Sequence, residues 1–142
     1  MNTVTDYCTQ ADLDARFGAD EILQLTDRDA DGVADTGVLD VAIADAGTTI
    51  DTYIAKRYDL PLAEIPAALV KVACDMVRYA LHKEDPPDRV AASQKDAMTF
   101  LRDVAAGRAV LDVAGTEPVG AVDDVIVEGP DRVFSSDTMT GF

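Results

Sequence analysis

The fold is decided by the stretch Ile65-Pro-Ala-Ala-Leu-Val-Lys-Val-Ala-Cys-Asp-Met-Val-Arg-Tyr-Ala-Leu-His82. Proline fits the first turn of a helix because its missing N–H leaves no bond unmade there, so Pro66 predicts where this helix begins. The pair Pro86-Pro87 prevents the helix from running much further, which leaves about 17 helical residues, about 25 Å in length. Apolar residues wrap most of its circumference, so we expect neighbours on more than one side. They are Leu69, Val70, Val72, Ala73, Cys74, Met76, Val77, Ala80 and Leu81.

Helical patterns precede this stretch in the sequence. Thr9 and Asp12 have the spacing of a capping box and predict a short helix over residues 10–17, followed by a further helical turn or two over residues 19–25. From Thr36 to Arg57, apolar residues recur at steps of three and four, which predicts a long helix capped by Asp35 or Thr36. The long helix and the Ile65–His82 helix then form an αα-hairpin.

A fifth helix follows, capped by Asp88 and ending at Gly107. After it the pattern changes, and residues 109–113 and 122–127 are typical of short strands or extended segments. The predicted fold is therefore mostly α, a small bundle of about five helices with an extended C-terminal arm that contains short strand-like segments. Residues 1–107 form the helical domain, and residues 108–142 form the arm.

Composition limits the classes of function. Twelve Lys and Arg against 27 Asp and Glu give a net charge of −15, which argues against a groove that grips the phosphates of nucleic acid. The sequence has no long apolar run and no basic-then-apolar beginning, so we expect a soluble, cytosolic protein without a membrane partner. Of the 2 cysteines, Cys8 and Cys74, both are expected to be reduced, with Cys74 a small core residue.

The strongest local motif is the acidic loop, residues 27–35. Its carboxylates stand at positions 1, 3, 5 and 9 around a glycine at position 6, as in a calcium loop of the EF-hand type, and they are Asp27, Asp29, Asp31 and Asp35 around Gly32. The bidentate carboxylate expected at position 12 is replaced by Val38. The alternative is a turn in which the aspartates bond to their own backbone. No other cofactor is predicted.

Nothing in the sequence predicts an enzyme. His82, the single histidine, stands at the end of a helix, and no serine lies on a strained turn beside a base, so no catalytic residue is assigned. Lys71, Arg78 and Tyr79 are interpreted as the edges of the central helix, with their polar tips reaching water.

The end of the arm needs a partner. Its apolar side chains cannot bury themselves on so short a segment, and such residues usually require another surface. The residues predicted to bind another surface, such as that of a neighbouring subunit, are Arg132, Val133, Phe134, Met139 and Phe142.

Several short motifs occur here in a familiar order: Tyr7-Cys-Thr-Gln-Ala-Asp-Leu13, Arg16-Phe-Gly18, Leu25-Thr-Asp-Arg-Asp29, Ile50-Asp-Thr-Tyr-Ile54, Arg57-Tyr-Asp-Leu-Pro-Leu62 and Arg132-Val-Phe-Ser-Ser-Asp-Thr-Met-Thr-Gly-Phe142. In these the chain resembles a family of small proteins encoded among the head and neck genes of Mu-like prophages, with similar proteins in related phages and gene transfer agents. The resemblance covers nearly the whole chain and is weakest between about residues 105 and 130.

This resemblance implies a head-tail connector, also called an adaptor or head-completion protein. Such a subunit is structural and forms a ring, commonly of twelve copies, beneath the portal, with the arm docked on the portal or on a neighbouring copy. The implied partners are the portal, a tail-side neck protein and other copies of the chain, while DNA passes through without tight binding. The implied location is the neck of the virion, after assembly in the bacterial cytoplasm. The alternative function is a calcium-dependent binding module built on the acidic loop.

Overall fold

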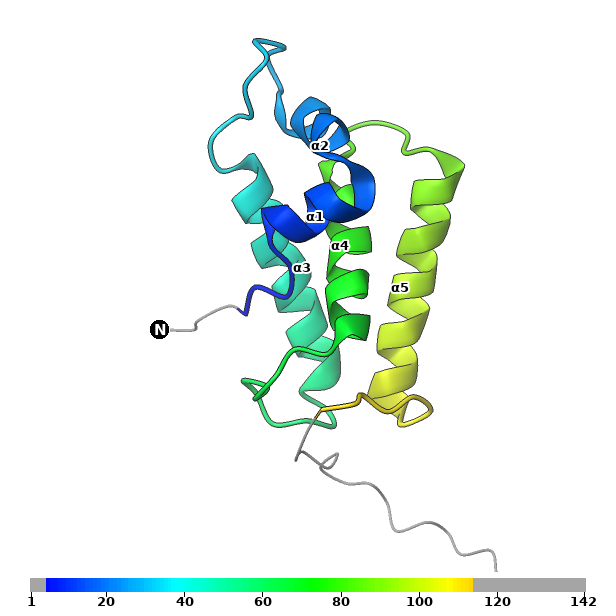
Figure 1. Ribbon diagram of the computed structural model, residues 1–142. Helices are drawn as coiled ribbons and strands as arrows, with labels where there is room; N and C mark the ends of the chain where they lie inside the picture. The colour runs from blue at the N-terminus through cyan, green and yellow to red at the C-terminus, as the bar shows by residue number, and fades with distance from the viewer. Residues whose placement is uncertain (1–4, 114–142) are drawn as a thin grey trace, which may run out of the picture.

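The computed structural model describes residues 5–113, which fold into a bundle of five helices (Figure 1). Two short helices, α1 (Gln10–Phe17) and α2 (Ala19–Thr26), precede the longer α3 (Val38–Ile54), α4 (Ala67–Leu81) and α5 (Asp88–Ala106). Within residues 5–113 there is no strand, so the predicted mostly α fold is confirmed. The stretch at 109–113, expected to be strand-like, is irregular and has no strand partner among these residues.

Helix α4 is the centre of the bundle, as its sequence predicts. It lies between α3 and α5, and the pair α1 and α2 crosses it near one end (Figure 1). Its apolar side chains are buried almost all the way round; Leu69, Cys74 and Val77 are each 0% exposed. Burying one such side chain contributes roughly 1.5–3 kcal/mol to folding, so this helix supplies much of the free energy that holds the bundle.

The N-terminal cap of α1 matches the prediction, because Thr9 and Asp12 form a complete capping box. The cap predicted for α3 is wrong. Gly37, with a φ of +83°, precedes the helix and makes no side-chain cap bond. Asp35 cannot serve, because its carboxylate accepts a hydrogen bond from the N–H of Arg28 at 2.6 Å. The long helix is thus shorter than expected and also ends early, at Ile54.

The cap predicted for α5 is also wrong in detail. Pro87 occupies the capping position, and Asp88 is the first helical residue, where its negative charge still favours the helix N-terminus. The end of α5 is as predicted, with Gly107 in the left-handed conformation at φ +79°.

Helix α2 is fastened to α4 by a partly buried ion pair. Nη2 of Arg78 lies 2.6 Å from Oε1 of Glu21, and the guanidinium lies 4.4 Å from the centre of the Phe17 ring. The side chain of Arg78 is 12% exposed, so the interpretation of Arg78 as an edge reaching water is wrong. Lys71 does match that interpretation: it is largely exposed and pairs with Asp75 one turn along the helix.

Candidate functional site

The acidic loop joins α2 to α3 and is shaped by its own aspartates. The carboxylate of Asp27 accepts the N–H of Gly32 at 2.8 Å and that of Asp31 at 3.1 Å. Asp29 also accepts the N–H of Asp31, and Asp31 in turn accepts the N–H of Val33. Ala30 and Gly32 have positive φ values of +60° and +88°, which turns the chain sharply. The aspartates therefore bond to their own backbone.

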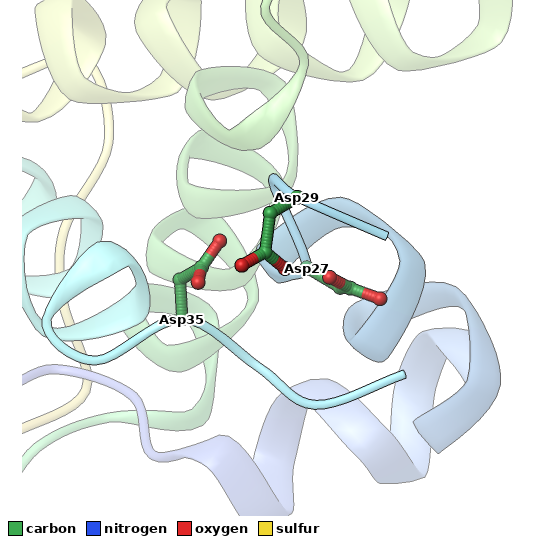
Figure 2. Close-up of side chains that lie close together, drawn as sticks. All are labelled: Asp27, Asp29 and Asp35. Atoms are coloured by element: carbon green, nitrogen blue, oxygen red, sulfur yellow. The ribbon is translucent and has the colours of Figure 1, made fainter. Parts of the chain in front are cut away.

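Three of the four predicted ligands converge. Carboxylate oxygens of Asp27, Asp29 and Asp35 all lie within 4.8 Å of one another (Figure 2). Asp31 is not in this group, because its carboxylate is directed to the backbone of Val33. Asp29 is exposed and the other two are half-buried.

The pKa values of Asp27 and Asp29 are shifted in opposite directions. The pKa of Asp27 is lowered, chiefly by the backbone N–H of Gly32, and the pKa of Asp29 is raised by loss of solvent and by its acidic neighbours. Like charges held this close disfavour each other's ionised form, and a bound cation would remove that conflict. Carboxylate oxygens are the ligands that Ca²⁺ prefers, so the donor set fits calcium in kind, although Val38 supplies none.

A second region of interest is the foot of the bundle, which we define as residues 55–62 and 107–113. The chain leaves α5 here and continues toward the C-terminus (Figure 1). Tyr58 is 3% exposed, and its hydroxyl accepts the N–H of Leu111 at 2.8 Å. Leu111 and Val113 are themselves buried in the core. The first residues of the predicted arm are therefore fixed to the helical body.

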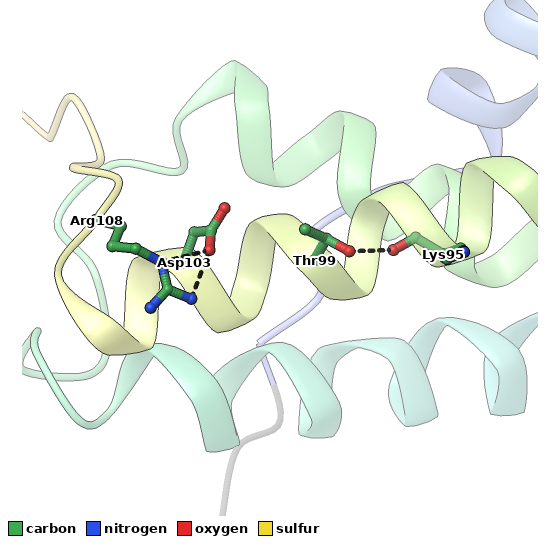
Figure 3. Close-up of polar contacts among 4 residues, drawn as sticks. All are labelled: Lys95, Thr99, Asp103 and Arg108. Carbon is green, nitrogen blue, oxygen red and sulfur yellow. Dashed lines mark hydrogen bonds and ion pairs between the residues drawn. The ribbon is translucent and has the colours of Figure 1, made fainter.

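The end of α5 is reinforced at two points. A Cβ placed on Gly107 would lie 1.5 Å from Nη2 of Arg57, so the guanidinium rests directly against this glycine at the helix C-terminus, where positive charge is favourable. Arg108 pairs with Asp103 across the last turn, Nη2 to Oδ1, at 2.7 Å (Figure 3). Earlier on the exposed face of α5, Thr99 donates to the carbonyl of Lys95 at 2.9 Å (Figure 3). Arg57 and Arg108 thus both contact the end of α5, where the chain enters the foot.

The predicted partner-binding residues Arg132, Val133, Phe134, Met139 and Phe142 lie outside the described residues, as does the strand-like segment 122–127. The anchoring roles of Arg57, Tyr58 and Leu111 were missed by sequence reasoning. The motif Arg57-Tyr-Asp-Leu-Pro-Leu62 was the available signal, since its arginine and tyrosine stand at the end of the predicted long helix.

Across residues 5–113, no helix combines the length and the apolar composition needed to cross a membrane.

Comparisons with known proteins agree with the motif order. Residues 7–128 match the protein family described as "Bacteriophage Mu, Gp36". The chain is 34% identical over 104 residues to "Gene product J" of Escherichia phage Mu, an alignment that covers 72% of this chain and 74% of the relative. It is also 34% identical over 102 residues to "Mu-like prophage FluMu protein gp36" of Haemophilus influenzae, covering 71% of this chain and 72% of that protein. The chain belongs to the bacteriophage Mu Gp36 family.

Proposed function

We propose that this protein is a structural head-tail connector subunit that forms a ring, commonly of twelve copies, beneath the portal of a tailed phage or phage-like particle. Its partners would be the portal, a tail-side neck protein and further copies of itself. It would be assembled in the bacterial cytoplasm, reside in the neck of the virion and have no catalytic role. Membership of a phage Mu family is the observation that carries this proposal.

The anchored foot supports docking through the arm. A docking segment can fix the helical body on a partner only if the start of the segment is itself attached to that body. Here the hydroxyl of Tyr58 accepts the N–H of Leu111, and Val113 is buried. The contact itself would be made by Arg132, Val133, Phe134, Met139 and Phe142 on the portal or on a neighbouring subunit. Two aromatic anchors in such a contact would dominate its free energy.

The surface charge supports passage of DNA through the ring without capture. Residues 1–50 contain eleven acids and two bases, Arg16 and Arg28, a balance of 2 − 11 = −9. Six of the acids are exposed, namely Asp6, Asp20, Asp29, Asp31, Asp40 and Asp45. A lumen lined by these groups makes no phosphate contacts and releases no counterions. The purified protein should therefore not retard DNA in a gel even at low salt, and a retarded band that salt abolishes would contradict this part of the proposal.

The docking proposal is tested by removing residues 132–142. The truncated chain should keep its helical circular dichroism and its melting temperature, yet fail to sediment with assembled portal rings. A finer pair of variants keeps the chain length: Phe134→Ala with Phe142→Ala should weaken sedimentation, whereas Ser135→Ala with Ser136→Ala should not. Full co-sedimentation of the truncated chain would overturn docking through the arm.

A second candidate function, a calcium-dependent binding module, is favoured by one observation, the convergence of Asp27, Asp29 and Asp35. Because Val38 stands where a closing carboxylate is needed, we expect weak binding, with a Kd of about 10⁻⁴ to 10⁻³ M. Isothermal titration with Ca²⁺ should give heat that Asp29→Ala removes and Asp40→Ala leaves unchanged. The absence of heat at millimolar calcium would leave the loop as a turn held by its own aspartates.

A further inference from the structure

An apolar groove runs between α4 and α5 and begins at the foot. The two helices lie side by side, and two hollows of about 460 and 280 Å³ lie along them (Figure 1). The larger is lined by residues 64–68 and 110–112, and the smaller reaches Val72 and Ala97, further along the two helices. Both hollows are lined by Ala68 and Phe100, so they form one groove.

The groove is open to water at its lower end. Val110 is 70% exposed, Ala68 is exposed and Phe100 is half-buried. The next residue, Leu111, is buried, and its N–H is bound by Tyr58. The chain is thus held at the foot with the side chain of Val110 directed outward beside the groove. Residues 5–113 leave this apolar surface uncovered, and burying it would stabilise the protein.

The chain that continues from the foot carries a segment suited to this groove. Residues 122–127 read Val-Asp-Asp-Val-Ile-Val, in which four of six side chains are apolar and β-branched. They lie outside the described residues but within the family match, which extends to residue 128. The link from residue 113 to residue 122 can span up to about 30 Å when extended, and the groove follows only the last few turns of α5. The segment can therefore reach any part of the groove.

We propose that residues 122–127 of the same chain occupy the groove between α4 and α5, where their apolar side chains cover Phe100 and Val110. The link is short and starts beside the groove, so the local concentration of the segment is in the millimolar range. A second copy of the chain does not reach that concentration in dilute solution. The packing concerns a single chain, so it does not depend on the connector role.

Apolar contact, not charge, must hold the segment in place. The groove is lined by the acids Glu64, Asp96 and Asp112 and by one base, Lys71, which already pairs with Asp75. The segment itself carries two acids and no base. Contact between surfaces of like charge weakens at low salt and persists at high salt, because salt screens the repulsion. The seated segment should therefore stay in the groove when salt is raised.

The first test uses a fluorescent reporter in the full-length chain. The sequence has no tryptophan, so Phe100→Trp places a single indole in the groove. Neighbouring residues of an extended segment point to opposite sides, so Val125→Asp with Ile126→Asp removes an apolar contact whichever side faces the groove. We expect the emission to shift to the red and the melting temperature to fall by about 4 °C or more. Val133→Asp with Phe134→Asp, the matched control, should change neither. Unchanged emission and melting temperature in the first pair would overturn the proposal.

The second test distinguishes the chain's own segment from that of another copy. One cysteine replaces Ala68 in the groove, and a second replaces Val125 or, in a separate variant, Ile126. The native cysteines are buried and are kept in every variant. Mild oxidation of the dilute chain should give a monomer with an internal disulfide in at least one variant. Asp40→Cys, exposed on α3 outside the groove, should form no such bond with the same partners. A disulfide-linked dimer, or no bond in either variant, would overturn the proposal.

Discussion

The acidic loop and the foot both lie outside the helices, but they are held in different ways. In the acidic loop, the hydrogen bonds that the aspartates accept join residues two to seven positions apart, as between Asp27 and Gly32 or Arg28 and Asp35, while the Arg28 side chain reaches further and donates to the carbonyl of Leu81 at the end of α4. At the foot, the bond between Tyr58 and Leu111 joins residues 53 positions apart. The turn of the loop is therefore shaped by its own aspartates, with one side-chain bond from Arg28 to α4, whereas the contact at the foot exists only once α3, α4 and α5 have packed. Changes at the foot should accordingly affect global stability, and changes in the loop should affect local properties.

The largest effect is expected at Tyr58. Tyr58→Ala removes a buried aromatic side chain and should lower the free energy of unfolding by about 3–5 kcal/mol. Tyr58→Phe keeps the ring but leaves the buried N–H of Leu111 without its acceptor, so about 1–3 kcal/mol should be lost. Urea denaturation measures both, with Tyr53→Phe on the partly buried face of α3 as the control. A Tyr58→Phe variant as stable as the parent would mean that this bond does not hold the foot.

A pair of glycines gives a direct comparison of the two regions. Gly107 at the foot and Gly32 in the loop have similar positive φ values, +79° and +88°, so alanine is strained at either by about 1–2 kcal/mol. At Gly32 the added methyl group meets open space, whereas at Gly107 it meets the guanidinium of Arg57. Gly107→Ala should therefore lower the melting temperature more than Gly32→Ala. Equal shifts in melting temperature would mean that the contact between Gly107 and Arg57 adds nothing to the cost of the substitution.

The smallest effect concerns the two loop carboxylates, and its sign is informative. The lowered pKa of Asp27 means that this group stabilises the fold above the ordinary aspartate pKa of about 3.9, a contribution lost as pH falls through the folded value. The raised pKa of Asp29 has the opposite meaning, since its ionised form is disfavoured by folding. At pH 7 Asp27→Asn should lower the melting temperature slightly and Asp29→Asn should raise it slightly. At a pH well below both pKa values, the two shifts in melting temperature should vanish. Shifts of the same sign at pH 7 would mean that the pKa values of Asp27 and Asp29 are not displaced in opposite directions.

The same contrast explains what could be predicted from the sequence. The helices of the bundle follow from the local periodicity of apolar residues and from residues that begin or end helices, namely Pro66, Pro86 and Gly107. The turn of the acidic loop follows from its closely spaced aspartates. Asp35 was predicted to cap α3 because aspartate is a common capping residue. In the structure its carboxylate already accepts a hydrogen bond from the N–H of Arg28. The motif at residues 57–62 marks Tyr58 as a candidate anchor, but its partner Leu111 could not be predicted, because the two meet only through the packing of the whole bundle.

The ion pair between Arg78 and Glu21 is likewise a contact that depends on the packing of distant helices and could not be predicted from the sequence. A charged residue on an apolar helix usually reaches water with its polar tip, but here Glu21 on α2 and Phe17 on α1 hold Arg78 between the helices. Single-sequence patterns predict which side chains are polar but not which element will meet them.

The connector role is tested most directly by electron microscopy of particles from the phage or prophage that encodes this chain. We expect a ring of this chain between portal and tail, with the anchored foot directed so that residues 132–142 reach the portal or an adjacent copy. Density for the chain elsewhere in the particle, or a mature neck that lacks it, would rule out the connector role.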